Sequence, residues 1–153
     1  MQINIGDHSS SAEGYLPVPA HLREQLYWAR TKARNIAATH PDANKYFLQL
    51  RKRRSLTDLL ADRTIWVNYS VLLGKDYGET TDYNEIAIAP IAFRIGRWTV
   101  LATVIHELAH CNGAAGRRSS EAELAVLACG LGRKSEQVLG DDPYTPYNPN
   151  TRG

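Results

Sequence analysis

The first half of the chain shows the periodicity of amphipathic helices. After Pro19, apolar residues recur at helical spacing and share one helix face: Leu22, Leu26, Ala29, Ala33, Ile36 and Ala37. This spacing predicts a helix over residues 20–39, and the His-Pro-Asp sequence that follows predicts its end. A second helix is expected from about Ala43 through the basic run Arg-Lys-Arg-Arg at 51–54, with a bend or restart at Ser55.

The pattern changes to alternation in the middle of the chain. Residues 64–70 are rich in β-branched and aromatic side chains and predict a strand. Residues 84–90 predict a second strand, ended by Pro90, and the two strands are expected to pair antiparallel. The turn-rich segment at 74–82 and the segment at 91–96 are both expected to be irregular.

A continuous apolar segment without Pro or Gly begins at Trp98. Its core-facing side is predicted from residues at helical spacing, namely Leu101, Ile105 and Leu108. Gly96 stands just before this helix, and Asn112-Gly113 is a stop signal, because glycine readily takes the left-handed conformation that ends many helices.

After a short loop, a further helix is predicted from Ser119 or Ser120 to Cys129, ending near the glycines at 130–132. The Pro- and Asn-rich tail predicts no regular structure. The elements indicate an α+β fold in one domain over residues 1–153. Its expected parts are an irregular arm (1–19), a helical part (20–62), a core that carries the chemistry (64–132) and an irregular tail (133–153).

The composition narrows the class of protein. A chain of 153 residues is long enough to bury a core, and a formal net charge of +2 indicates no strong attraction to nucleic acid or to membranes. No apolar run has the length of a membrane span. The N-terminus lacks the basic start and apolar stretch of a secretory signal, so we expect a cytoplasmic protein or one exported without such a signal.

The basic run and the cysteines both have ordinary explanations. The run at 51–54 is either a nucleic-acid patch or a solvated helix face. We favour the solvated face, because the run lacks interleaved aromatic residues. Cys111 and Cys129 form no CxxC pair, so reduced and buried thiols are expected.

The apolar helix carries the motif HExxH, formed by His106, Glu107 and His110. Positions i and i+4 of a helix share one face, so two imidazoles one turn apart can bind a single metal ion. Glu107 projects beside that face, where a carboxylate can act as a general base. The motif is the zinc signature of metallopeptidases. Two core histidines without a metal are the alternative, and they would leave three polar groups without partners in an apolar segment.

The order of strands, HExxH helix and Glu-bearing second helix over residues 64–130 resembles the zincin metallopeptidases, and most closely their gluzincin branch. The resemblance implies a small zincin-like domain with a short antiparallel sheet, and a Zn²⁺ ion held by two His and a Glu. It also implies an edge strand that pairs with extended substrate, here residues 86–89. The metzincin branch is excluded, because Gly116 stands where its third His belongs and Met1 is the only methionine.

Glu123 and Glu121 are the candidates for the third zinc ligand. Both lie in the first turn of the predicted following helix, about 200° apart, so only one can face the metal. We favour Glu123, because the apolar residues at 124–128 follow it at once, and a carboxylate in such surroundings is better explained by a metal. Glu121 remains the alternative ligand, or a partner that orients a histidine.

A peptidase also needs a donor that stabilises the oxyanion. The candidates are Tyr144 and Tyr147 in the tail, and Arg117 and Arg118 after the motif. The resemblance thus implies a zinc peptidase that acts on a protein or peptide substrate. Two alternatives remain: a non-catalytic zincin-like binding or regulatory module, and a metal-dependent amidase acting on cell-wall peptide.

Overall fold

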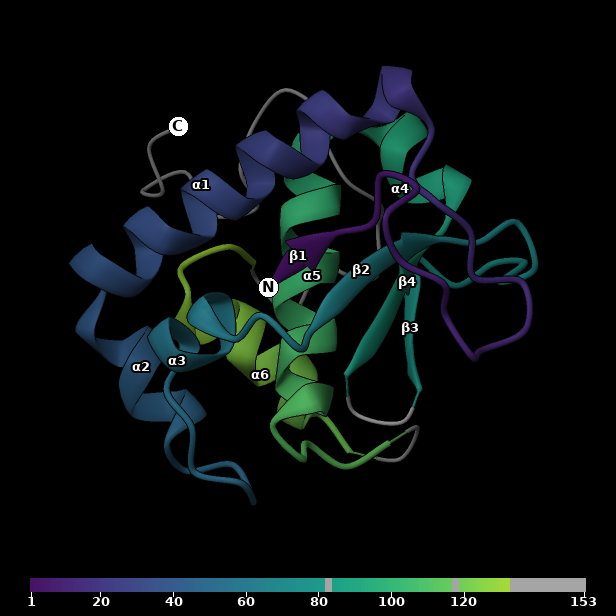
Figure 1. Cartoon of the computed structure of the whole chain (residues 1–153). Coiled ribbons are helices and arrows are strands. Elements are labelled where there is room, and N and C mark those ends of the chain that lie inside the picture. Colours follow the sequence, from purple (N-terminus) through teal and green to yellow (C-terminus); the bar gives the residue numbers. More distant parts are fainter. Residues whose placement is uncertain (82–83, 117–118, 133–153) are drawn as a thin grey trace.

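A computed structural model describes residues 1–81, 84–116 and 119–132 (Figure 1). The fold is mixed α+β. A short 3-10 turn, η1 (Ala20–Leu22), leads into α1 (Arg23–Thr39), and α2 (Pro41–Phe47) and α3 (Leu56–Ala61) follow. The helix predicted over residues 20–39 is confirmed, and so is the break after it, because Pro41 opens a new helix at its first position.

The prediction that the second helix continues through the basic run was wrong. α2 ends at Phe47, and residues 51–54 form a turn in which Arg53 has a left-handed backbone (φ 52°). The restart at Ser55 is confirmed. Its hydroxyl accepts the backbone N–H of Asp58, and the Asp58 carboxylate accepts the N–H of Ser55. This capping box needs an extended residue at its start, which a continuous helix excludes.

The sheet in the described residues has four strands: β1 (Gln2–Ile3), β2 (Trp66–Tyr69), β3 (Gly78–Thr81) and β4 (Glu85–Ile88). Their order is β1-β2-β4-β3. The two predicted strands exist as β2 and β4, but they pair parallel, so the expected antiparallel sheet was wrong. The antiparallel position beside β4 is occupied by β3. The sheet is therefore mixed.

The edge strand next to β4 is also different from the one expected. Residues 86–89 lie largely in β4, which has a neighbour on each side, whereas β3 forms the edge. The Gly-Glu-Thr-Thr sequence of β3 does not predict a strand, because Gly and Glu are depleted in strands and no apolar alternation is present. A further helix, α4 (Pro90–Ile95), occupies a segment expected to be irregular.

The N-terminal arm is held against the sheet by buried polar side chains. The Asn4 amide donates to Asn68 Oδ1 at 2.8 Å, and the Asn68 amide donates to Glu85 Oε2 at 2.6 Å. The second Glu85 oxygen lies 2.6 Å from His8 Nε2. Each buried group of this chain of contacts thus has a partner, as buried polar groups require. Apart from β1, which pairs with β2, the arm is irregular as expected, and these contacts hold it in place.

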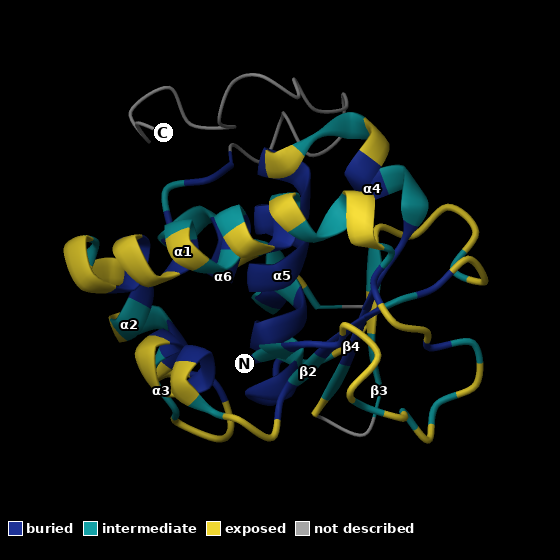
Figure 2. Cartoon of the chain, turned by 45° about the horizontal axis from the view of Figure 1, so that its top comes forward, coloured by how far each residue is buried: buried dark blue, intermediate teal, exposed yellow. Residues whose placement is uncertain are grey.

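The HExxH helix, α5 (Arg97–Cys111), runs through the middle of the molecule. It packs against α1, α4, β3, β4 and the following helix, α6 (Glu121–Ala128). In Figure 2, α5 is dark blue along most of its length. Arg97, His106 and His110 are its only residues that are not buried. No helix in the described ranges combines the length and apolar character that crossing a membrane demands.

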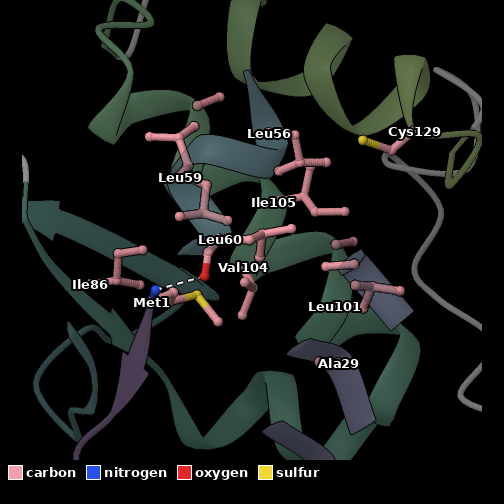
Figure 3. Close-up of a cluster of buried hydrophobic side chains, with 14 of the residues drawn as sticks. Met1, Ala29, Leu56, Leu59, Leu60, Ile86, Leu101, Val104, Ile105 and Cys129 are labelled. Carbon is pink, nitrogen blue, oxygen red and sulfur yellow. Dashed lines mark hydrogen bonds between the residues drawn. The ribbon is translucent and has the colours of Figure 1, made fainter. Parts of the chain in front are cut away.

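Figure 3 shows how distant segments meet on α5. Side chains of α1, α3 and β4 meet side chains of α5 in one buried cluster, among them Ala29, Leu56, Leu59, Leu60, Ile86, Leu101, Val104 and Ile105. The amino group of Met1 donates to the carbonyl oxygen of Leu60 at 2.8 Å at the same place. The core therefore joins the N-terminal helices to the sheet through α5.

The end of α5 anchors the basic turn. α5 ends at Cys111, and Gly113 just beyond it has the predicted left-handed backbone (φ 90°). Asn112, between the two, is fully buried. The Asn112 amide donates to the carbonyl oxygens of Phe47 (2.7 Å) and Arg54 (2.8 Å), and its Oδ1 accepts the Arg54 N–H (3.2 Å). One side chain thus satisfies three backbone groups of the segment between α2 and α3.

Replacing Asn112 with Ala is expected to lower the free energy of unfolding by about 2–4 kcal/mol, because three backbone groups lose their partner in a buried place. Urea unfolding of both proteins measures this. Asn35→Ala, on the exposed face of α1, is the control and should stay within about 0.5 kcal/mol of the wild type. An unchanged urea midpoint for the Asn112 variant would contradict this account of the anchor.

Candidate metal centre

The two histidines of the motif lie against each other on a part of α5 that is not fully buried. Their rings stand nearly edge to face, with His106 Nε2 3.2 Å from His110 Nε2. Two nitrogen ligands of a tetrahedral zinc ion, each about 2.0–2.1 Å from the metal, lie roughly 3.3 Å apart. The spacing of the pair fits one zinc ion. It also suits a hydrogen bond in which His106 donates to His110.

His110 has the tautomer that metal binding needs. Its Nδ1 lies 3.1 Å from the carbonyl oxygen of Ala114, an acceptor, so Nδ1 carries the proton and donates it. Nε2 is then left with its lone pair. Metal-bound histidines usually donate their second ring nitrogen in this way, which fixes the ring and its tautomer.

The peptide group that holds His110 is itself held by Glu121. The N–H of Ala115 belongs to the same peptide unit as the Ala114 carbonyl, and it donates to Glu121 Oε2 at 2.6 Å. The Glu121 backbone carbonyl accepts a hydrogen bond from the Tyr46 hydroxyl at 3.0 Å. Glu121 therefore acts on His110 through one peptide unit. Its carboxylate is engaged away from the histidine pair, which disfavours Glu121 as the alternative ligand.

His106 is kept in its neutral form by its surroundings. Burial, and next the neighbouring His110, lower the pKa of the His106 imidazole below its ordinary value, whereas Glu123 acts in the opposite direction. A neutral imidazole is the form that binds a metal ion. The neutral form of His106 and the spacing of the two Nε2 atoms are therefore both compatible with a shared metal ion.

Glu123 lies beside His106. Its Oε1 lies 3.9 Å from Nδ1 of His106, the ring nitrogen that does not face His110. The side chain is 41% exposed, yet its Oε2 atom is buried and has no hydrogen-bond partner. A buried carboxylate oxygen without a partner is costly. In this arrangement, however, Glu123 approaches the ring nitrogen opposite the pair of Nε2 atoms, so a role as third ligand needs a change in the side-chain conformation of Glu123 or His106. The donor set of two imidazoles and one carboxylate is also one that zinc accepts.

The described residues do not form a complete metal site. Among them, no group of three or more His, Cys, Asp and Glu side chains has an arrangement that could hold a metal ion. Glu123 as the third ligand therefore stays a prediction. Cys111 and Cys129 are free and buried, as expected, and burial raises the pKa of each thiol to about 12, which disfavours the thiolate that metals bind.

Glu107 lies under the edge strand, in contact with two residues that the sequence did not single out. Its side chain is buried (4% exposed), and its Oε2 accepts a hydrogen bond from Thr80 Oγ1 at 2.7 Å. A Cβ atom added to Gly78 would lie 3.0 Å from Glu107 Oε1. Burial raises the pKa of Glu107 to about 7. Thr80 and Gly78 were missed because their segment was expected to be irregular.

The four candidates for an oxyanion donor, Arg117, Arg118, Tyr144 and Tyr147, lie outside the described residues. Comparisons of this chain with models of protein families, with curated proteins and with solved structures found no match.

The purified protein is expected to bind about one zinc ion per chain, and His106→Ala and His110→Ala should each lose nearly all of it. Affinity should fall as the pH drops through the titration of the histidines, because a protonated imidazole cannot coordinate a metal. Elemental analysis and titration with a zinc indicator measure both. His21→Ala, at an exposed position of η1, should bind like the wild type. No zinc uptake by the wild type would refute the site.

Glu123 and Glu121 are expected to differ in how strongly they affect zinc binding. Glu123→Ala should lose nearly all bound zinc if this carboxylate is a ligand. Glu121→Ala should weaken binding roughly 10–100-fold, because its loss frees the Ala114–Ala115 peptide that orients His110. Competition with a chelator at fixed pH gives both affinities. Full zinc retention in Glu123→Ala would show that another group completes the site.

Proposed function

We propose that this chain is a zinc-dependent metallopeptidase with a zincin-like site on α5. The observation that carries the proposal is the geometry of the histidine pair: the two Nε2 atoms are 3.2 Å apart, and His110 Nδ1 is engaged with the Ala114 carbonyl. His110 Nε2 thus keeps its lone pair for a metal ion, and the spacing of the two Nε2 atoms suits two ligands of one zinc. The predicted ligands are His106, His110 and Glu123.

When bound, zinc would supply a Lewis acid that polarises the scissile carbonyl and makes water a stronger nucleophile at neutral pH. The protein's part is to orient the ligands. The Ala114 carbonyl sets the ring of His110, and Glu121 holds that peptide unit in place. The orientation of the ligands affects both the affinity for zinc and its reactivity. The Ala114–Ala115 peptide and Glu121 are therefore part of the proposed site, together with the ligands.

Glu107 is the proposed general base. It takes a proton from the attacking water and passes it to the leaving amine. A general base works best when its pKa lies near the working pH, and burial raises the pKa of Glu107 to about 7. The carboxylate accepts a hydrogen bond from Thr80 under β3, which holds it in a buried place rather than in solvent.

The edge strand β3 is the proposed place of the peptide substrate. β3 has a single sheet neighbour, β4, so its second edge is not used by another described strand. An extended peptide can add to such an edge through main-chain hydrogen bonds, independently of most of its side chains. Because β3 also contacts Glu107, a peptide bound there would run close to the proposed base.

Glu107→Gln is expected to lower kcat by about 10²–10⁴-fold, because an amide cannot take the proton from water. Zinc content and melting temperature should change little, since the amide oxygen still accepts the Thr80 hydrogen bond. Cleavage of a peptide library by the zinc-loaded proteins, followed by kinetics on the best substrate, measures this. Glu79→Gln, at an exposed position on the same strand, is the control. Turnover near the wild-type value in Glu107→Gln would refute the assignment.

A further inference from the structure

We propose that Thr80 is a positioning residue for Glu107: its hydroxyl holds the carboxylate in the one orientation that serves proton transfer. The inference rests on the proposed role of Glu107 as the base. It assigns a function to the edge strand itself, whose side chains carry no recognisable motif.

The contact joins two segments that are far apart in the sequence. Thr80 Oγ1 donates to Glu107 Oε2 at 2.7 Å and lies 3.2 Å from the Glu107 backbone carbonyl oxygen. A hydroxyl has a single proton, so the shorter contact to the carboxylate takes it. A hydrogen bond to a charged group is short and strong, and here it is made in a buried place. It therefore restricts a side chain that would otherwise have several rotamers.

Gly78 allows β3 to come this close to Glu107. It lies two residues before Thr80, so both face the same side of the sheet. A Cβ atom at Gly78 would lie 2.6 Å from Thr103 Cγ2 and 3.0 Å from Glu107 Oε1. The first distance is shorter than real Cβ contacts allow, so a side chain here would push β3 away from α5. The absence of a side chain keeps Thr80 within reach of the carboxylate.

The pairing of β3 with β4 sets which residue reaches Glu107. Thr80 stands opposite Ile86, and Gly78 stands opposite Ile88. Both isoleucines are fully buried, which fixes the register of β4. A slip of β3 by one residue would turn Thr80 to the other face of the sheet. The hydrogen bond to Glu107 is thus specified by core packing on the neighbouring strand.

A structural role and a positioning role predict different results. If Thr80 only satisfies a buried carboxylate, its loss lowers stability, and the folded molecules keep their kcat. If it positions the base, its loss lowers kcat in molecules that are folded and loaded with zinc. KM should respond little in that case, because the Thr80 side chain contacts Glu107 and not the substrate.

Thr80→Val keeps the shape of the side chain and removes the hydroxyl. We expect kcat to fall about 10–100-fold, since a small displacement of a catalytic group has effects of this size. KM should stay within about twofold, and zinc content should not change. Thr80→Ser, which retains the hydroxyl, should recover most of kcat. Thr31→Val makes the same change at an exposed position of α1, away from the site, and should behave like the wild type.

Crystal structures of the zinc-loaded wild type, Thr80→Val and Thr80→Ser test the same inference without using activity. We expect the Glu107 carboxylate to leave its place or to take several orientations in Thr80→Val, and to keep one in Thr80→Ser. An unchanged Glu107 in Thr80→Val, or an unchanged kcat, would overturn the proposal. If the wild type cleaves no peptide, the proposed function fails, and the crystal structures still decide whether Thr80 positions Glu107.

Discussion

Burial of α5 is the constraint on which the rest of the structure depends. The helix is apolar nearly all round, so every face must be covered, and α1, α4, α6 and the sheet do this. Beyond its first residue, Arg97, only His106 and His110 are not buried. A polar side chain on such a helix is costly unless it has a partner. Glu107 meets this requirement through Thr80, and the two histidines lie at the remaining gap.

The end of α5 contributes both to the stability of the fold and to the geometry of the site. Asn112 ties the turn between α2 and α3 to the helix end, and the next residues lead to the peptide unit between His110 and Glu121. The same short segment thus anchors distant backbone and orients a histidine. Because Gly113 allows the chain to leave the helix with a positive φ, both sets of contacts form within a few residues.

Local patterns were reliable for the two long helices, and less so for the basic run, for α4 and for the sheet. The 3.6-residue periodicity located α1 and α5, and the stop signals located their ends, because these depend on neighbours in the sequence. β2 and β4 pair as expected, but their direction was predicted wrongly, since the direction of a pairing depends on how segments meet in space. β3 was missed because its own composition disfavours a strand. It is stabilised instead by pairing with β4 and by packing on α5.

The sequence by itself determined that His106 and His110 share a helix face with Glu107 beside them, since the geometry of a helix follows from local hydrogen bonds alone. It also predicted a third ligand among two acids of the next helix, Glu121 and Glu123. Only the tertiary structure decided that the Glu121 carboxylate supports the loop at His110 whereas Glu123 lies beside His106, and that Thr80 reaches Glu107. These contacts join segments through the packing of α6 and β3 on α5, which no local pattern encodes.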